Sequence, residues 1–277
     1  HEVIGFRGED ADEIFSRCLK NTGGLTDSPL SPHVEDGWLR STLAPHGPHS
    51  VSPRLLQKVL AHNESTGGIS TIHLAESYEE DLFIRGGNGP FRGFLVKRGV
   101  WDPSWRSCPD GPVSYIDGLG FLRPGTICVH LVHASEEDLQ LLARRGVAAC
   151  VCPRSNKRTR VGQAPVEAML KVGLRVALGT DSLASNDDLN VLAEAQHLHG
   201  ESPGVPPQEI VRMLSLNGAL ALRWPQMGSI ADGKVGRLAL APVSDGSCRD
   251  PYEYLLERVD PREVKAVDAS GEGKGPF

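Results

Sequence analysis

The sequence of 277 residues has few aromatic side chains, no long apolar run and no concentration of positive charge. No stretch approaches about 18 consecutive apolar residues, so an ordinary membrane-spanning helix is not expected. The formal net charge is −6, and there is no long basic run. Phosphate binding normally needs a basic face, which argues against a nucleic acid as the main partner. We therefore expect neither a membrane nor a nucleic acid as partner.

The six cysteines also lack the spacing of a zinc finger. Cys128, Cys150 and Cys152 fall within predicted buried strands, which is typical of reduced core residues in a cytoplasmic protein. Cys150 and Cys152 could form a metal or redox pair; however, alternation along a strand places both on the same face of that strand. No other cysteine pair completes such a site.

Apolar strand-like runs instead alternate with helix-like runs over most of the chain, which predicts βα units around a parallel sheet. Two apolar runs lie near the start, at residues 2–6 and 39–44, and four follow at 69–74, 126–131, 147–152 and 174–179. We expect an α/β fold of the (β/α)8 TIM-barrel type with about six of its eight strands present. The simplest place for the other two strands is before residue 1.

The pattern changes after residue 227, where a turn-rich segment leads to a short strand at residues 238–243. We therefore predict a barrel domain over residues 1–227, lacking its first strands, and a β-sandwich return segment over residues 228–277. The long irregular stretch at residues 77–123 has two interpretations. It could be a lid or substrate-binding segment, or a packed crossover with short helices.

Three of the predicted strands end in side chains that bind metals or transfer protons. His73 and Glu76 follow one strand, His130 closes another, and Asp181 follows the last. Strand ends in a barrel converge on one face, where active sites lie. His and Asp are ligands for catalytic zinc or iron, and Glu76 can face the same activated water. His73 alone could be a core histidine and Asp181 a helix cap, but together they favour a metal-dependent site.

Five segments resemble, in the same order, motifs of the amidohydrolase superfamily, in its cytosine deaminase-like and chlorohydrolase-like branch. The resemblance covers residue 1 to about residue 243. Its five segments are PHGPHSVS at 45–52, IHLAE at 72–76, HLVH at 130–133, CPRSN at 152–156 and GTDSLASN at 179–186. Each motif is weak alone, whereas five in the right order are a strong signal.

The resemblance implies a role for each matching residue. His73 and Asp181 would ligate one divalent metal ion, zinc or iron. Glu76 would move protons between the attacking water and the leaving group, and His130 would hold and polarise the reacting group of the substrate. Asp181 would also orient the water and help to deprotonate it. The resemblance further implies substrate contacts, made by His46, Arg154 and Ser182.

One feature of that family is missing from the sequence. Its first strand normally supplies a His-x-His pair to the metal, and no such strand is present. His197 and His199 are two residues apart in a predicted helix, so their side chains point about 200° apart. We interpret them as part of an ordinary helix with a solvated histidine. The chain would be N-terminally incomplete, and alone it should retain metal weakly and show little activity.

The favoured function is hydrolytic deamination of an aminated purine or nucleoside-type heterocycle by metal-activated water, of the aminofutalosine or adenosylhomocysteine kind. A small molecule is then the partner, and a homodimer is expected from the habits of the family. A chlorohydrolase or cyclic amidohydrolase acting on a related ring would use nearly the same residues. A catalytically inactive fragment or scaffold is a further alternative. A phosphate-binding barrel such as an aldolase would want a Gly-rich loop and a strand-end lysine.

Overall fold

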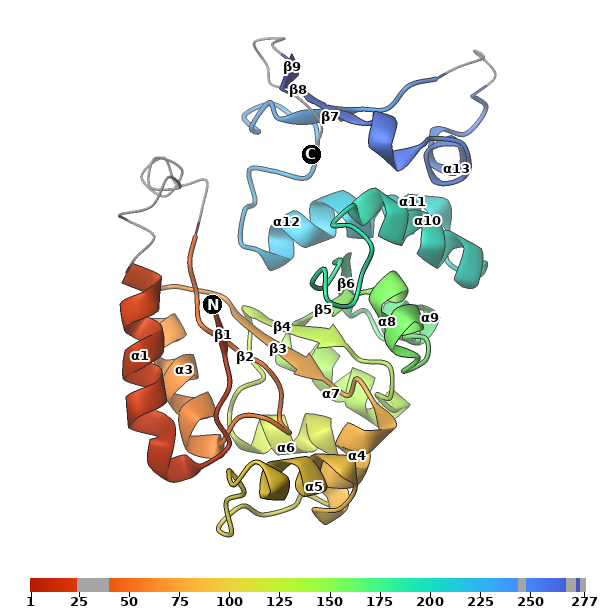
Figure 1. Cartoon of the computed structure of the whole chain (residues 1–277). Coiled ribbons are helices and arrows are strands. Elements are labelled where there is room, and N and C mark those ends of the chain that lie inside the picture. Colours follow the sequence, from red (N-terminus) through yellow and green to blue (C-terminus); the bar gives the residue numbers. More distant parts are fainter. Residues whose placement is uncertain (24–39, 244–247, 268–272, 275–277) are drawn as a thin grey trace. The chain divides into compact units, whose positions relative to one another are not determined.

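The computed structural model describes residues 1–23, 40–243, 248–267 and 273–274. The chain forms two compact units, His1–Ala149 and Cys150–Phe277, and the boundary falls inside strand β5 (Ala148–Val151). Figure 1 shows helices and strands alternating along the chain. The boundary that we predict between residues 227 and 228 is a different division and stays a prediction.

The first unit begins with β1 (Glu2–Val3), which pairs in parallel with β2 (Ala44–Pro45). The predicted strand at residues 39–44 begins outside the described residues, and only its last residue is in β2. Between them lie a 3-10 turn, η1 (Gly8–Asp10), and α1 (Ala11–Gly23). Helix α3 (Pro53–Ser65) follows β2 and begins as predicted, with the Ser52 side chain accepting from the Leu55 N–H.

Two parallel strands carry most of the predicted catalytic residues of this unit. β3 (Ser70–Leu74) pairs with β4 (Thr126–His130), and Leu74 lies opposite His130. Both strands are largely buried, as expected for a parallel sheet covered by helices. Helix α7 (Glu136–Arg145) follows β4 and opens with a capping box between Ser135 and Asp138. These helix and strand positions match the prediction closely.

The crossover between β3 and β4 contains α4 (Tyr78–Gly86), α5 (Pro90–Lys97) and α6 (Pro112–Gly118). Phe83 stacks on Trp105 with ring centroids 4.7 Å apart, and Phe6 stacks on Trp101 at 5.7 Å. Aromatic stacking therefore packs the crossover segment against the loop that follows β1. The segment is a packed crossover with short helices, and a lid role is untested.

The second unit contains the end of β5 and β6 (Arg175–Leu178), with the Gly179 N–H donating to the Val151 carbonyl at 3.0 Å. Two short helices that the sequence pattern did not predict lie between these strands. They are α8 (Pro153–Thr159) and α9 (Val166–Lys171). After β6 come four helical segments: α10 (Val191–Glu201), α11 (Pro207–Arg212), a π-helical turn, η2 (Met213–Asn217), and α12 (Gly218–Ala221).

The described part of the tail of this unit contains a small antiparallel sheet. β7 (Leu238–Leu240) pairs with β8 (Lys265–Val267), which pairs with β9 (Gly273–Lys274). The predicted β structure is therefore present. Helix α13 (Pro251–Glu257) and the 3-10 turn η3 (Pro261–Glu263) were not predicted. Among the described residues, no helix has both the length and the apolarity needed to cross a bilayer.

Candidate active site

The ends of the parallel strands carry unusual backbone conformations. Ala75, His130 and Asp181 have φ angles of 49°, 73° and 58°, in the left-handed region that non-glycine residues seldom adopt. Such conformations persist only where the surroundings impose them, and they cluster at active sites. Each of the three is a predicted site residue or lies next to one. Arg160 and Arg223 have similar φ angles and are not predicted site residues, so this conformation occurs at the motif positions without being confined to them.

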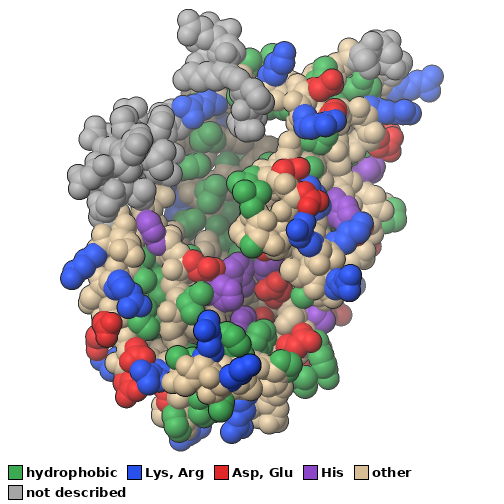
Figure 2. Space-filling model, viewed as in Figure 1, with side chains coloured by type: hydrophobic (Ala, Val, Ile, Leu, Met, Phe, Trp, Pro, Cys, Tyr) green, Lys and Arg blue, Asp and Glu red, His purple; other side chains and the backbone are tan. Residues whose placement is uncertain are grey.

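Four histidines gather in the first unit, at the ends of β2, β3 and β4. The ring centroids of His46 and His49 are 5.4 Å apart, those of His46 and His73 are 5.0 Å apart, and those of His73 and His130 are 5.2 Å apart. Figure 2 shows a group of histidine side chains near the middle of the face in view, with other histidines apart from it. Chain segments distant in sequence thus bring several imidazoles together.

Within this group, Glu2, His46 and His73 form a set that could hold a metal ion, because their ligand atoms lie within 4.8 Å of one another. The Nδ1 atom of His73 is 2.7 Å from the His46 carbonyl oxygen, and the Nδ1 atom of His46 is 2.7 Å from Ser50 Oγ. Such contacts orient an imidazole so that Nε2 can bind the metal. Two imidazoles and a carboxylate are a donor set that catalytic zinc accepts.

Glu2 was not predicted as a site residue, because nothing in its sequence neighbourhood distinguishes it from a surface acid. The parallel pairing of Glu2 with Ala44 brings it to the segment that carries His46. The family resemblance implies that His46 contacts the substrate. The geometry also allows His46 to bind the metal.

Glu76 and His130 form the second part of the site in this unit. The Oε1 atom of Glu76 is 3.8 Å from Nε2 of His130, whose side chain is 1% exposed. A carboxylate near a buried imidazole can exchange protons with a substrate held between or beside them. The roles of Glu76 and His130 in catalysis stay predictions.

A further acid, Glu80, holds the loop that carries Glu76. Its two carboxylate oxygens accept from the backbone N–H groups of Ala75 and Glu76, at 2.9 and 3.1 Å. Burial of the Glu80 side chain raises its pKa to about 8, although these N–H groups act in the opposite direction. The sequence Ser77-x-x-Glu80 at a helix start resembles a capping box, so its role in the loop was not foreseen.

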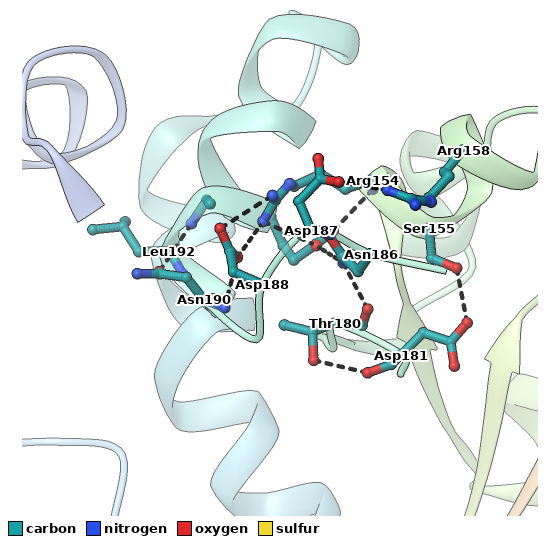
Figure 3. Close-up of polar contacts among 12 residues, drawn as sticks. Arg154, Ser155, Arg158, Thr180, Asp181, Asn186, Asp187, Asp188, Asn190 and Leu192 are labelled. Carbon is teal, nitrogen blue, oxygen red and sulfur yellow. Dashed lines mark hydrogen bonds and ion pairs between the residues drawn. The ribbon is translucent and has the colours of Figure 1, made fainter. Parts of the chain in front are cut away.

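In the second unit, Asp181 is held by hydroxyl groups. Its Oδ2 atom accepts from Ser155 Oγ at 2.8 Å and from Ser185 Oγ at 2.6 Å, and Figure 3 shows the first of these contacts. Both serines belong to predicted motifs. Ser182, predicted to contact substrate, accepts from the Ala184 N–H at 3.3 Å.

The guanidinium group of Arg154 has carboxylate partners within its own unit. It donates to Asp188 at 2.7 and 3.3 Å and lies 3.7 Å from Glu194 (Figure 3 shows Arg154 and Asp188). The buried Glu194 also accepts from the Arg154 N–H and from the Asn186 side-chain amide, at 2.9 and 2.7 Å. Glu194 thus links α10 by hydrogen bonds to the motifs at residues 152–156 and 179–186. The sequence analysis did not predict this role.

The motif that contains Asp181 begins with Gly179, because a larger residue would not fit at this position. A Cβ atom there would lie 2.6 Å from Cys150 Sγ and 3.5 Å from Cys152 Sγ. The two thiols therefore face the same side of β5, as alternation predicts, and all six cysteines are free.

His197 and His199 lie on α10, as predicted, and each has a carboxylate partner. Nε2 of His197 is 3.0 Å from Glu201, and Nε2 of His199 is 3.4 Å from Glu257. Their side chains are 21% and 22% exposed, so the expected solvated histidine is half-buried instead.

The predicted site residues fall into two groups. His46, His73, Glu76 and His130 come together in the first unit. Three others lie in the second unit: Arg154, Asp181 and Ser182.

Two curated relatives are about a third identical to the chain over the aligned residues. A 5-methylthioadenosine/S-adenosylhomocysteine deaminase of Nitratidesulfovibrio vulgaris is 31% identical over 287 residues, covering 94% of the chain and 61% of the relative. An aminodeoxyfutalosine deaminase of Deinococcus radiodurans is 32% identical, covering 76% of the chain and 50% of the relative. The chain thus spans about half to three-fifths of the length of these relatives.

A solved structure gives the same picture of the fold. Atrazine chlorohydrolase of Arthrobacter aurescens TC1, complexed with zinc, matches with a TM-score of 0.73 and 20% identity, over 100% of the chain and 61% of that protein. This likeness supports the α/β fold of TIM-barrel type. The model of the amidohydrolase family matches residues 30–264. The chain belongs to the amidohydrolase family.

Proposed function

We propose that the protein is a metal-dependent hydrolytic deaminase that acts on an aminated purine or nucleoside-type ring. The observation that carries this proposal is the placement of Glu76 beside the buried His130, next to the donor set of Glu2, His46 and His73. The two curated relatives, both named as deaminases of nucleoside-like molecules, support the same chemistry.

The metal in this proposal is one divalent ion, zinc or iron. The residues of the first unit fit such an ion, because a carboxylate and two oriented imidazoles converge there. The resemblance adds Asp181 to His73 as a ligand. When bound, the ion would supply Lewis-acid activation of water near neutral pH.

Glu76 and His130 perform the proton transfer and charge stabilisation in the proposed reaction. Water adds to the ring carbon that bears the amino group, and ammonia leaves. The Glu76 carboxylate accepts a proton from the attacking water and returns it to the ring nitrogen or the departing amine. His130, fixed by burial, donates to the atom on which negative charge develops. Glu80 keeps Glu76 in place through the two backbone contacts.

Substrate contacts by His46, Arg154 and Ser182 belong to the same proposal. His46 carries an imidazole that lies 5.0 Å from that of His73, centroid to centroid, so it can reach a substrate near the metal set. Arg154 would contact substrate only through the guanidinium atoms that Asp188 leaves available. We also propose a cytoplasmic location, because six free cysteines suit a reducing compartment.

The test is ammonia release from methylthioadenosine, S-adenosylhomocysteine and aminodeoxyfutalosine, with zinc supplied. The change Glu76→Gln should lower kcat about 100-fold or more, because it removes the proton carrier. Glu79→Gln, an exposed acid in the first turn of α4, is the matched control and should leave kcat unchanged. The chain alone should be slow and should hold zinc weakly, so bound zinc is measured in the same samples. A zinc-loaded chain that releases no ammonia above the Glu76→Gln background from any of the three would contradict the proposal.

Release of chloride from atrazine is the matching test for the alternative, a chlorohydrolase. It is favoured only by the structural likeness to atrazine chlorohydrolase. Turnover of atrazine without turnover of any nucleoside would favour that alternative.

A further inference from the structure

Two thiol groups, those of Cys150 and Cys152, lie next to each other in the second unit and have no role in the proposed deamination. A hydrogen bond joins them. Both flank the space that a side chain would fill at Gly179, where a Cβ atom would lie 2.6 Å from one sulfur and 3.5 Å from the other. Cys150 is half-buried and Cys152 is buried, so a small solute can reach the pair from the Cys150 side.

The spacing of the two cysteines does not suit a disulfide bond. Alternate residues of a strand have Cα atoms about 6.6 Å apart. Disulfides most often join Cα atoms about 5.5–6 Å apart, so closing this pair would distort the end of β5. A single ion between the sulfurs needs no such movement, because metal–thiolate bonds are about 2.3 Å long and the space beside Gly179 is close to that distance from Cys150.

The charges near the pair favour a cation. Asp181 and Glu194 lie close enough to Cys152 to act on its thiol electrostatically. Two thiolates would add to this negative charge, whereas two thiolates that share a cation would not. Metal binding releases the thiol protons, so the cation takes their place.

The number of ligands selects the kind of cation. Thiolates bind soft ions, among them copper(I), zinc and the iron of iron–sulfur clusters. Zinc sites and iron–sulfur clusters are normally completed by four protein ligands. Among the described residues, the only set of three such donors is that of Glu2, His46 and His73, so no third donor of this kind joins the thiol pair. Copper(I) is satisfied by two thiolates in a near-linear arrangement.

We propose that Cys150 and Cys152 form a two-coordinate site for a soft monovalent cation, copper(I), in addition to the zinc or iron ion of the proposed function. Each sulfur forms one bond to the ion and releases its proton to solvent, and nothing is oxidised or reduced. Gly179 leaves the room that the ion occupies.

The experiment titrates the reduced chain with copper(I), supplied as its acetonitrile complex without oxygen, against the chelator bicinchoninate. Zinc is present to occupy the histidine set, and the colour of the copper–bicinchoninate complex reports how much copper the chain withdraws. The wild type should withdraw one equivalent. Cys150→Ser and Cys152→Ser should each lower the affinity at least about tenfold, since even residues that only orient a metal ligand contribute that much. Cys108→Ser, at another half-buried thiol, is the control and should bind like the wild type.

Two results would overturn the inference. Equal copper affinity in the wild type, Cys150→Ser and Cys152→Ser would show that the ion is held elsewhere. A wild type that withdraws no copper but forms a Cys150–Cys152 disulfide in air, detected by mass spectrometry, would make the pair a redox couple instead. Urea midpoints are recorded for every variant, and if the buried Cys152→Ser change unfolds the chain, Cys150→Ser decides the outcome.

Discussion

At the scale of single residues, the site depends on side chains that support the candidate catalytic residues and need not contact the substrate. Glu80 holds two consecutive backbone N–H groups at the end of β3, and the second of these belongs to Glu76. Ser155 and Ser185 hold one oxygen of Asp181. The Glu80 contact includes the N–H group of Ala75, which has a left-handed backbone, and the serine contacts orient the Asp181 carboxylate.

Glu80 should make stability fall with rising pH. Its folded pKa of about 8 lies above the ordinary value of 4.5, so the folded chain keeps a proton that the unfolded chain has lost. The stabilisation is therefore complete below about pH 4.5 and disappears as the pH rises through 8. Urea unfolding from pH 5 to 9 should show this decline in the wild type and a flatter profile in Glu80→Gln.

Glu79→Gln is the control for that series, since Glu79 is an exposed neighbour on the same helix turn. It should follow the wild-type profile. A Glu80→Gln profile parallel to that of the wild type would show that Glu80 is already ionised at neutral pH.

The sequence located the residues of the site better than their supports. His73 and His130 lie in the last residues of β3 and β4, and Glu76 and Asp181 follow β3 and β6, so periodicity and motif order place all four at strand ends. Glu80 looks like a cap, and Glu2 and Glu194 look like ordinary helix or strand acids. Their roles depend on neighbours distant in sequence, such as the pairing of β1 with β2.

At the scale of elements, helix positions followed from capping signals where these were strong. Ser52-Pro53 and Ser135 mark the beginnings of α3 and α7. α8 and α9 were missed, because they begin after Cys152 and Pro165, whose side chains make no capping hydrogen bond. The second strand was placed too early, since only Ala44 of residues 39–44 takes part in the short pairing at Ala44–Pro45.

Glu194 should contribute measurably to the attachment of helix α10, beside its buried apolar residues Leu192, Ala195 and Leu198. Glu194→Ala leaves the Arg154 N–H and the Asn186 amide without their buried acceptor. Such losses cost about 1–3 kcal/mol for each buried group, so the urea midpoint should fall clearly. Asp187→Ala removes an exposed ion pair with Arg158 and should change the midpoint little. Equal midpoints for the two variants would contradict the assignment.

At the scale of the whole molecule, the candidate ligands are divided between the two compact units. Glu2, His46 and His73 belong to the first unit and Asp181 to the second. The family resemblance implies His73 and Asp181 as ligands but does not imply Glu2. Measuring the zinc affinity of variants can therefore show which of the two donor sets holds the ion.

Zinc titration of the desalted chain should distinguish them. His73→Ala should weaken zinc binding more than tenfold, about 1.4 kcal/mol or greater, because both sets include His73. Glu2→Gln should weaken it similarly if the first-unit set holds the ion, and Asp181→Asn if the ligand inferred from the resemblance does. Unchanged zinc affinity in His73→Ala would exclude both sets.

The left-handed conformations at Ala75, His130 and Asp181 also bear on how the protein could change under selection. Glycine adopts such angles without steric cost, so Ala75→Gly is a simple route to a more heat-resistant chain. The same residues aim the groups that would turn over substrate, and stability gained at active sites is commonly paid for in activity. Laboratory evolution for thermal tolerance and evolution for turnover should therefore choose opposite residues at these three positions.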